Sequence, residues 1–398
     1  MKIALGLEYP LALRGGVSVL VEKLIEGLAG SYEVVLVSAD APGFEHPRAC
    51  AHVHWDPSAV SRHTSRELAG RLGELGVSLA HFHAGGNYGW GNRIPGRSPF
   101  PFLRQKGIAC VSTIHMAVSI LDGYCDAAKP AWFKLALFPL AWLGKVNGLR
   151  SAQAEVVVSQ KAYERVRRWY WPMRRRFRWI YHSRLPATAP ATAPGAREPL
   201  VLCVGHIALR KGQHTLAAAF AKLAPAHPEW KLVIIGPAGE DDCLAQIQAT
   251  SAAHKLHERI LLPGSRDDAM DFMRRAAIFV QPSLFEGLPL ALQEAMFCGC
   301  ACVATRVMGN DELIEDGRTG LLAPPLNAGR MAEALEVLMR DPARREALGR
   351  AAATSVLEKG MTAAKMTERH ITLYESILAA RRPPAETTMK AATISNHD

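Results

Sequence analysis

The chain has 398 residues, of which 49% are hydrophobic and 21% are charged. At about 100 to 200 residues per domain, this length predicts two or three domains with cores of their own and excludes a small disulfide-stapled scaffold. Eight cysteines without a CxxC pair likewise do not indicate a disulfide framework or a zinc site.

The net charge of +10 is unevenly distributed. Residues 1–185 hold 24 basic and 13 acidic residues, whereas residues 186–398 hold 23 and 24. The excess in the first half indicates an anionic partner for that half, either a phospholipid surface or a nucleic acid. The N-terminus turns acidic at Glu8 before any apolar stretch long enough for a signal peptide, and no run approaches the roughly 20 apolar residues of a membrane span. We therefore expect a cytoplasmic protein.

The first half of the chain alternates strand-like and helix-like patterns. Between the first two predicted strands, apolar residues recur from Val17 to Leu28 at the spacing of an amphipathic helix. The strand-like runs are nearly continuous in apolar residues, as is typical of parallel strands buried on both faces. These predicted strands lie at residues 3–7, 33–38, 77–83, 108–115 and 155–159.

A run of alanine, proline and threonine at residues 186–199 is predicted to link two domains. We therefore expect two doubly wound α/β domains, at residues 1–185 and 200–360. Residues 361–380 are predicted to form a helix that packs back on the first domain, and residues 381–398 a disordered tail. In the second half, predicted strands lie at 200–205, 230–236, 259–263 and 278–282, and predicted helices at 213–223, 243–254, 268–276 and 289–297.

The loop after the predicted strand 278–282 leads to two carboxylates eight residues apart, Glu286 and Glu294. Parallel sheets bind ligands at the carboxyl ends of their strands, and Pro289 is typical of the first position of a helix. A helix N-terminus suits phosphate, and a carboxylate farther along can accept hydrogen bonds from the hydroxyls of a ribose, so the pattern favours a nucleotide site. In the alternative interpretation, Glu286 is a capping charge and Glu294 an exposed helix residue.

Two further loops have features of a phosphate site. The run GHIALRKG places Arg210 and Lys211 after a predicted strand. Gly15 and Gly16 open the first predicted helix, where the backbone can approach a ligand. The sequence has neither GxGxxG nor GxxxxGK, which disfavours a dinucleotide dehydrogenase and a P-loop enzyme.

Three segments carry a family resemblance: GHIALRKG at 205–212, PSLFEGLPLALQEAMFCG at 282–299 and VATRVMGNDELIEDGRTGLL at 303–322. They resemble the donor-binding domain of the retaining glycosyltransferases of family 4, whose GT-B fold has two Rossmann-like domains facing a cleft. The family's motif of two glutamates separated by seven residues corresponds to Glu286 and Glu294. The Gly15-Gly16 pair and the STIH run ending at His115 extend the resemblance over nearly the whole chain.

The resemblance implies that the chain transfers a sugar from a nucleotide diphosphate sugar to an acceptor hydroxyl with retention of configuration. Glu294 would bind the ribose hydroxyls of the donor. Glu286, together with the loop amides of Gly287 and Leu288, would hold the sugar or stabilise charge at the reacting centre. The transfer would need no cofactor. Its acceptor would be a saccharide, such as one of the cell envelope or one linked to a lipid.

The remaining implied roles concern charge around the diphosphate. Lys211 would neutralise the diphosphate, Gly16 would approach it from the first domain, and His115 would face the sugar or the acceptor. The sequence contains no Asp-x-Asp pair, which fits a metal-independent transfer in which protein cations stabilise the leaving group.

The chain departs from the family pattern at two places. His206 stands where the family usually has arginine, and Arg210 is predicted to supply the missing charge. His182 and Ser183 stand where the family has Asn-Gly. These changes motivate two alternative functions, a catalytically weak GT-B scaffold that serves as a binding partner and a nucleotide-sugar epimerase.

Other segments of the first half bear on partners. Residues 130–146 combine aromatic side chains with Lys134 and Lys145, as in a segment at a membrane interface or in a packed core. Residues 165–178 hold seven arginines, which favours an anionic membrane surface on the inner face of the membrane; no recognised module supports nucleic acid. His81 and His83 share one face of a strand, but the sequence offers no further ligand beside them, so no metal site is predicted.

Overall fold

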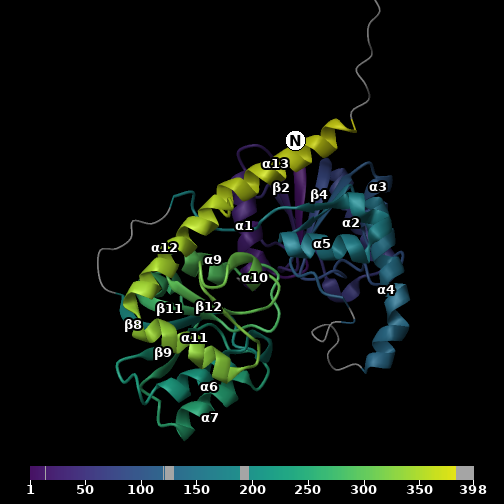
Figure 1. Ribbon diagram of the computed structural model, residues 1–398. Coiled ribbons are helices and arrows are strands. Elements are labelled where there is room, and N and C mark those ends of the chain that lie inside the picture. Colours follow the sequence, from purple (N-terminus) through teal and green to yellow (C-terminus); the bar gives the residue numbers. More distant parts are fainter. Residues whose placement is uncertain (14, 120, 122–129, 189–196, 382–398) are drawn as a thin grey trace, which may run out of the picture.

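The computed structural model describes residues 1–381 except 14, 120, 122–129 and 189–196. These residues form two parallel β-sheets, each with helices packed against both faces (Figure 1). The predicted architecture of two doubly wound α/β domains is confirmed. The predicted linker 186–199 lies partly outside the described residues, as does the predicted tail except for Arg381.

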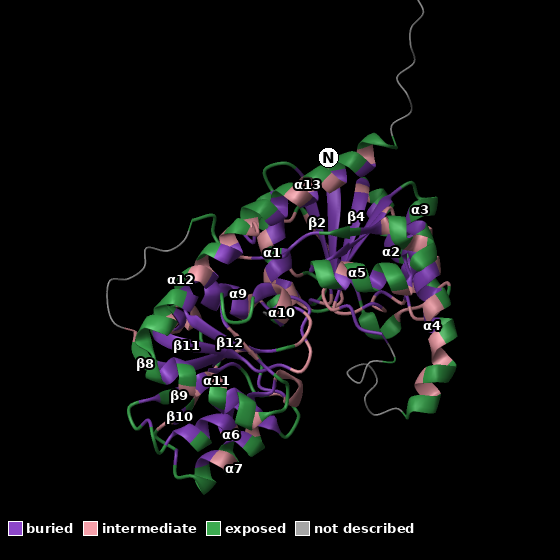
Figure 2. Ribbon diagram, viewed as in Figure 1, coloured by how far each residue is buried: buried purple, intermediate pink, exposed green. Residues whose placement is uncertain are grey.

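The first sheet has the strand order β3-β2-β1-β4-β5-β6-β7, and all its neighbours are parallel. Its strands form because they are nearly continuous in apolar residues, which sit in the core on both faces of the sheet (Figure 2). The strands are β1 (Lys2–Leu7), β2 (Glu33–Ser38), β3 (Ala51–His54), β4 (Val77–Ala84), β5 (Ala109–Ile114), β6 (Ala154–Val157) and β7 (Phe177–Trp179).

The helices around the first sheet complete its two cores. Leu24 and Ile25 of α1 pack against one face together with Ile3 and Leu5, whereas Leu68 of α2 packs on the other face. The helices are α1 (Gly16–Leu28), α2 (Arg62–Glu74), α3 (Phe100–Gln105), α4 (Ala131–Ser151) and α5 (Gln160–Trp169), with short 3-10 helices η1 (Leu11–Leu13), η2 (Pro57–Ala59) and η3 (Trp171–Arg176).

The second sheet has the strand order β10-β9-β8-β11-β12-β13 and is also parallel throughout. Along β8, Val201 and Cys203 face one core while Leu200 and Leu202 face the other. The strands are β8 (Glu198–Val204), β9 (Lys231–Ile235), β10 (Ile260–Gly264), β11 (Ala276–Gln281), β12 (Ala301–Thr305) and β13 (Leu321–Ala323). The helices are η4 (Leu209–Lys211), α6 (Gln213–Leu223), α7 (Cys243–Ala253), α8 (Ala269–Arg275), α9 (Leu290–Phe297), α10 (Asn310–Leu313), α11 (Ala328–Arg340) and α12 (Pro342–Glu358).

The last described helix, α13 (Ala363–Ala379), returns from the second domain to the first (Figure 1). It packs on α1, and its residues Met366, Tyr374 and Ile377 enter the core of the first domain. Gly27 of α1 permits the close approach, because a Cβ atom there would lie 2.4 Å from the Thr367 hydroxyl oxygen. Through α13, the C-terminal end of the described chain therefore packs in the same core as the N-terminal strand β1.

Four strands were not predicted from the sequence: β3, β7, β12 and β13. Three of them lie at sheet edges, where a strand pairs on one side only and needs less apolar sequence. Cys298 and Cys300 are buried between α9 and β12, and Cys302 is buried in β12, as expected of small apolar side chains. Within the described part of the chain, no helix combines the length and apolar character needed to cross a bilayer.

Candidate active site

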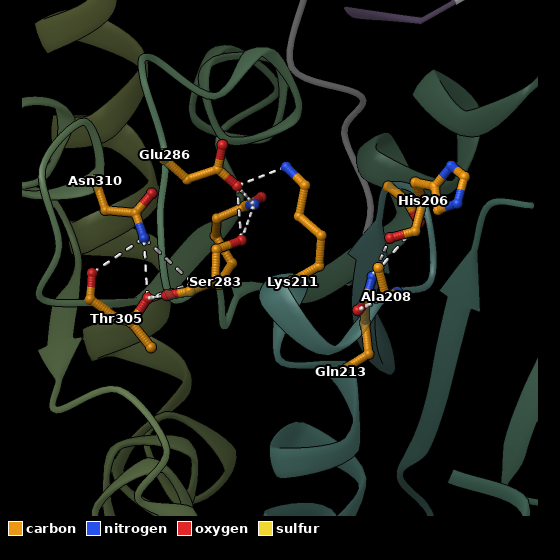
Figure 3. Close-up of polar contacts among 10 residues, drawn as sticks. His206, Ala208, Lys211, Gln213, Ser283, Glu286, Thr305 and Asn310 are labelled. Carbon is orange, nitrogen blue, oxygen red and sulfur yellow. Dashed lines mark hydrogen bonds and ion pairs between the residues drawn. The ribbon is translucent and has the colours of Figure 1, made fainter. Parts of the chain in front are cut away.

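A partly buried ion pair joins two loops at the carboxyl end of the second sheet (Figure 3). The strand order reverses between β8 and β11, which is where open parallel sheets bind ligands. The loop after β8 supplies Lys211 and the loop after β11 supplies Glu286, and Lys211 Nζ lies 2.6 Å from Glu286 Oε1. Because Glu286 is buried and Lys211 is less so, the pair presents its cation toward the more open side.

A hydrogen-bond network fixes the Glu286 carboxylate. Its Oε1 also accepts from the Ser283 hydroxyl at 2.6 Å and from Gln281 Nε2 at 2.9 Å. The Thr305 hydroxyl donates to the Ser283 carbonyl, and Asn310 Nδ2 donates to the Thr305 carbonyl at 3.0 Å. A carboxylate oxygen that receives three donors is held in one orientation, as a group that contacts a substrate must be.

Gly212 allows the two loops to approach each other. Its φ of +71° lies in the left-handed region, and a Cβ atom there would lie 2.0 Å from the Pro282 carbonyl oxygen. The Leu284 amide donates to the Arg210 carbonyl at 2.8 Å. Lys211 therefore reaches Glu286 because a glycine follows it.

Gln213 holds the rest of the loop that contains His206. Gln213 Nε2 donates to the His206 carbonyl at 2.9 Å, and the Ala208 amide donates to Gln213 Oε1 at 3.4 Å (Figure 3). The His206 side chain is exposed, at the position where the family resemblance led us to expect an arginine. The compensating role of Arg210 stays a prediction.

Gly287 brings the first domain to this loop. A Cβ atom at Gly287 would lie 1.8 Å from the His115 carbonyl oxygen, so only glycine fits between the two backbones. His115 follows β5, and its amide donates to the Ala84 carbonyl at 3.0 Å. Leu288, the next residue of the loop, is buried. The structure thus places the predicted residues His115 and Gly287 in contact across the domain boundary.

Glu294 is buried inside α9 and pairs with Arg184, which the sequence analysis did not single out. Arg184 Nε donates to Glu294 Oε1, and this hydrogen bond raises the pKa of the guanidinium. Glu294 is 3% exposed, which contradicts the alternative interpretation of an exposed helix residue. Pro289 is the N-cap of α9 rather than its first helical residue, and no side chain caps this helix.

The first sheet has a similar position at the carboxyl ends of its strands, where the strand order reverses between β1 and β4. Gly16 is the first residue of α1, and a Cβ atom at Gly15 or Gly16 would meet no atom within 4 Å, so packing does not require glycine there. Glu8 follows β1 and accepts a hydrogen bond from the Trp90 amide. Burial raises the pKa of Glu8 to about 7.

Five histidines meet between the first sheet and α13: His81, His83, His115, His182 and His370. His81 has a partner at each nitrogen, the Tyr374 hydroxyl at 2.5 Å and the Thr113 hydroxyl at 2.7 Å. Burial lowers the pKa of all five rings, that of His115 to about 3 and that of His370 to about 4. The rings are therefore neutral at pH 7. The sequence offered no ligands beyond His81 and His83, but folding brings His115 and His182 to them.

The two segments that were predicted to meet a membrane form α4 and the region from α5 to β7. In the first half of α4 the apolar side chains point outward; Trp132 is 69% exposed. Lys145, however, is buried against Glu155 at 2.5 Å, so this end of the segment follows the packed-core alternative. Among the described residues, the arginines at 165–178 form no ion pair with a carboxylate, and Trp171 beside them is 68% exposed.

Comparison with known proteins finds a family model that is similar to the second domain. Residues 189–355 match the family model described as glycosyl transferases group 1. The α-D-kanosaminyltransferase of Streptomyces kanamyceticus is 28% identical over 269 residues, which are 64% of this chain and 68% of that protein. The chain spans about half the length of the next curated relatives that it matches.

Two solved structures share the fold over nearly the whole chain. Sucrose-phosphate synthase from Thermosynechococcus elongatus has a TM-score of 0.75 at 22% identity, covering 96% of this chain and 100% of that one. HepE from Anabaena, solved in complex with UDP, has a TM-score of 0.73 at 17% identity, covering 94% and 100%. These likenesses confirm the GT-B fold that was predicted from the sequence. Residues 189–355, which contain every predicted donor-site residue of the second domain, are the part of the chain that matches the glycosyl transferases of group 1.

Proposed function

We propose that the chain is a retaining glycosyltransferase that moves a sugar from a nucleotide diphosphate sugar to an acceptor hydroxyl. The observation that carries the proposal is the Lys211–Glu286 pair at the strand-order reversal of the second sheet, in contact through Gly287 with the first domain. This edge is where the fold binds ligands, and Lys211 has the charge that a diphosphate requires. The likeness to HepE, solved with UDP, supports a nucleotide donor.

The position of each donor-site residue suits a particular role in binding the donor or in the transfer. Glu294 exchanges Arg184 for the ribose hydroxyls, because a buried carboxylate needs hydrogen-bond donors in either state. Lys211 turns from Glu286 toward the diphosphate, aided by Arg210, and stabilises the negative charge that builds up as the sugar departs. The loop amides at Gly287 and Leu288 and the Glu286 carboxylate hold the sugar.

Retention of configuration requires either a covalent intermediate or attack from the face that the leaving group occupies. Of the two carboxylates in the motif, Glu286 is fixed by Lys211, Ser283 and Gln281, and Glu294 is paired with Arg184. Neither is an unengaged nucleophile, which supports same-face attack assisted by the leaving phosphate. His115 and Gly16 then face the sugar and the diphosphate from the first domain. Lys211 and the loop amides supply the positive charge that a divalent ion supplies in other transferases, so transfer proceeds without a metal.

A transfer assay with the purified full-length chain and a panel of nucleotide sugars tests the proposal. We expect release of a nucleoside diphosphate with one donor class, activity that survives EDTA, and loss of turnover in Lys211→Ala. Arg306→Ala is the matched control, because Arg306 is an exposed cation of the same domain that pairs only with Asp316 among the described residues. Donor binding without turnover would overturn the proposal in favour of a scaffold, and interconversion of the donor's epimers would indicate an epimerase.

We also propose that the acceptor is a lipid-linked or envelope saccharide, reached from the inner face of a membrane. Exposed Trp171, Arg174 and Arg175 line a pocket together with Arg150 near the C-terminal end of α4, and Arg178 is also exposed. Exposed Trp132 and Leu135 lie at the other end of this helix, about 30 Å away at 1.5 Å per residue. Exposed cationic and aromatic side chains of this kind suit an anionic bilayer surface.

Co-sedimentation with liposomes tests this surface. We expect binding to phosphatidylglycerol vesicles that weakens with salt, and little binding to phosphatidylcholine vesicles. Each basic residue near such a surface contributes about 1 kcal/mol, so changing Arg174, Arg175 and Arg176 to Glu should weaken binding. The control changes Arg318, Arg330 and Arg350 of the second domain to Glu, which alters net charge equally but leaves the surface intact. Equal binding to both vesicle types would exclude the surface and favour a soluble acceptor.

A further inference from the structure

Three imidazoles from separate elements converge at the domain boundary. His83 lies near the end of β4, His115 directly after β5 and His182 three residues after β7. One nitrogen of each ring lies within 4.8 Å of the others, and His83 Nδ1 lies 3.1 Å from His115 Nε2. Two of the residues are therefore carried by neighbouring strands of a rigid sheet.

The spacing of the three rings is close to that of a tetrahedral metal site. Bonds of about 2.0 to 2.1 Å between zinc and nitrogen place ligand nitrogens about 3.3 Å apart and ring centres about 5 Å apart. The ring centres of His83 and His115 are 5.4 Å apart, those of His115 and His182 are 5.2 Å apart, and those of His83 and His182 are 6.0 Å apart. Small side-chain rotations would direct one nitrogen of each ring toward a single shared ion.

The hydrogen bonds of the cluster distinguish these rings from their neighbours. Both nitrogens of His182 and Nε2 of His83 are buried without a hydrogen-bond partner among the described residues. His81, one layer deeper, has both nitrogens bonded, and His370 is bonded to the Met366 carbonyl through Nδ1. His83 and His115 hydrogen-bond to each other at 3.1 Å, so among the described residues the ring nitrogens of His83 and His182 have no partner outside these three rings.

We propose that His83, His115 and His182 bind one divalent transition-metal ion, Zn²⁺ in particular, with a fourth position open to water or a ligand. Three imidazoles without an oxygen ligand favour zinc, copper or nickel over magnesium and calcium, which take oxygen ligands. His115 is the ligand that is only partly buried, so the ion enters from its side.

A metal ion bound here would also affect sugar transfer, an inference that rests on the proposed function. His115 cannot face the sugar while it holds a metal, and the ion would stand beside Gly287 and the donor loop. Zn²⁺ therefore inhibits a transferase that is active in EDTA. Metal binding is measured without a sugar donor. The result therefore tests the metal site independently of whether the chain is a transferase.

Calorimetry with Zn²⁺ and visible spectroscopy with Co²⁺, on the full-length chain stripped with EDTA and desalted, test the site. We expect one Zn²⁺ per chain and the intense visible absorption of four-coordinate Co²⁺, which added Zn²⁺ abolishes. His182→Asn and the partly exposed His115→Ala should both lose binding at the metal concentration that saturates the wild type.

Two histidine variants serve as matched controls. His63→Asn removes an exposed imidazole on α2, and His370→Asn removes a buried ring of the same cluster that is outside the ligand set. Both should bind Zn²⁺ as the wild type does, and thermal unfolding checks that each variant is folded. A wild-type chain that does not bind Zn²⁺, or folded His115→Ala that binds it unchanged, would overturn the site.

Discussion

Glu294 is a buried carboxylate whose partner, Arg184, approaches from the segment that precedes the linker. We expect Glu294→Gln to weaken binding of the nucleotide that supports turnover. A hydrogen bond to a charged acceptor contributes about 1.5 to 3 kcal/mol, so losing one charged acceptor lowers affinity by roughly tenfold to a hundredfold. Calorimetry measures the change. Glu333→Gln on α11 is the control, because Glu333 is exposed and pairs with Arg330. Unchanged affinity in Glu294→Gln would exclude the ribose role.

Glu8 makes the stability of the first domain depend on pH. Burial raises the pKa of this carboxyl from 4.5 to about 7, so the folded state binds the proton more tightly than the unfolded state does. The resulting stability is present below pH 4.5 and is lost as the pH rises through 7. Glu8→Gln, which keeps an acceptor for the Trp90 amide, should therefore become more stable relative to the wild type at pH 8 than at pH 5, by on the order of 3 kcal/mol at most.

Urea unfolding at the two pH values measures this difference. Glu346→Gln on α12 removes an exposed carboxylate and serves as the control. If the free energy of unfolding of Glu8→Gln differs from that of the wild type by the same amount at pH 5 and pH 8, the carboxyl is not the titrating group.

At the scale of elements, the sequence was sufficient to predict a strand or loop whose own residues determine its structure. Continuous apolar runs predicted the internal strands of the first sheet and β8, β9 and β11 of the second, since such strands must be apolar on both faces. The internal strand β12 was missed although it is buried. The short edge strands β3, β7 and β13 were missed, because pairing with a neighbour decides them rather than their own apolar content.

The residues of the candidate site also fall into those that the sequence could predict and those that it could not. Lys211, Glu286 and Glu294 lie in loops and a helix whose motif is continuous in sequence, so they could be predicted. Arg184 and His182 reach the site only because the chain after β7 crosses to α9, where Gln293 Nε2 donates to the His182 carbonyl at 3.2 Å. No local pattern encodes that crossing.

The donor loop between β11 and α9 depends on a glycine that no side chain can replace. In Gly287→Ala the new Cβ atom would overlap the His115 carbonyl, where a contact of 1.8 Å leaves no room. The loop or His115 must move, and overpacking of this kind costs about 1 to 3 kcal/mol. We expect lower thermal stability and a large loss of turnover.

Gly70→Ala is a matched control with the opposite sign. A Cβ atom at Gly70 in α2 meets no atom within 4 Å, and alanine in a helix is more stable than glycine by roughly 0.5 to 1 kcal/mol. Differential scanning calorimetry should show the two glycine variants shifting in opposite directions. An unshifted Gly287→Ala with normal turnover would contradict the contact between the domains at this loop.

At the scale of the whole molecule, a carboxylate of the second domain caps a helix of the first. Glu312 in α10 accepts the amides of Gln160 and Lys161 at 2.6 and 3.1 Å, at the N-terminus of α5. The Lys161 ammonium in turn lies 2.7 Å from Asp311. A negative charge at a helix N-terminus is favourable, so these contacts hold the two domains in the arrangement that places His115 against Gly287.

We expect Glu312→Ala to loosen that arrangement without unfolding either domain. Loss of a cap costs about 0.5 to 2 kcal/mol, enough to populate more open arrangements of two domains that α13 still connects. Small-angle scattering should show a larger radius of gyration for the free variant, and saturating donor should restore the wild-type value if donor bridges the domains. In kinetics, KM for the donor should rise more than kcat falls, since the variant retains every group that contacts the substrate. Glu346→Ala, an exposed α12 residue paired within its own helix, should leave both measurements unchanged. A radius of gyration equal to that of the wild type in Glu312→Ala would mean that packing of α13 and the Gly287 loop suffices to fix the domains.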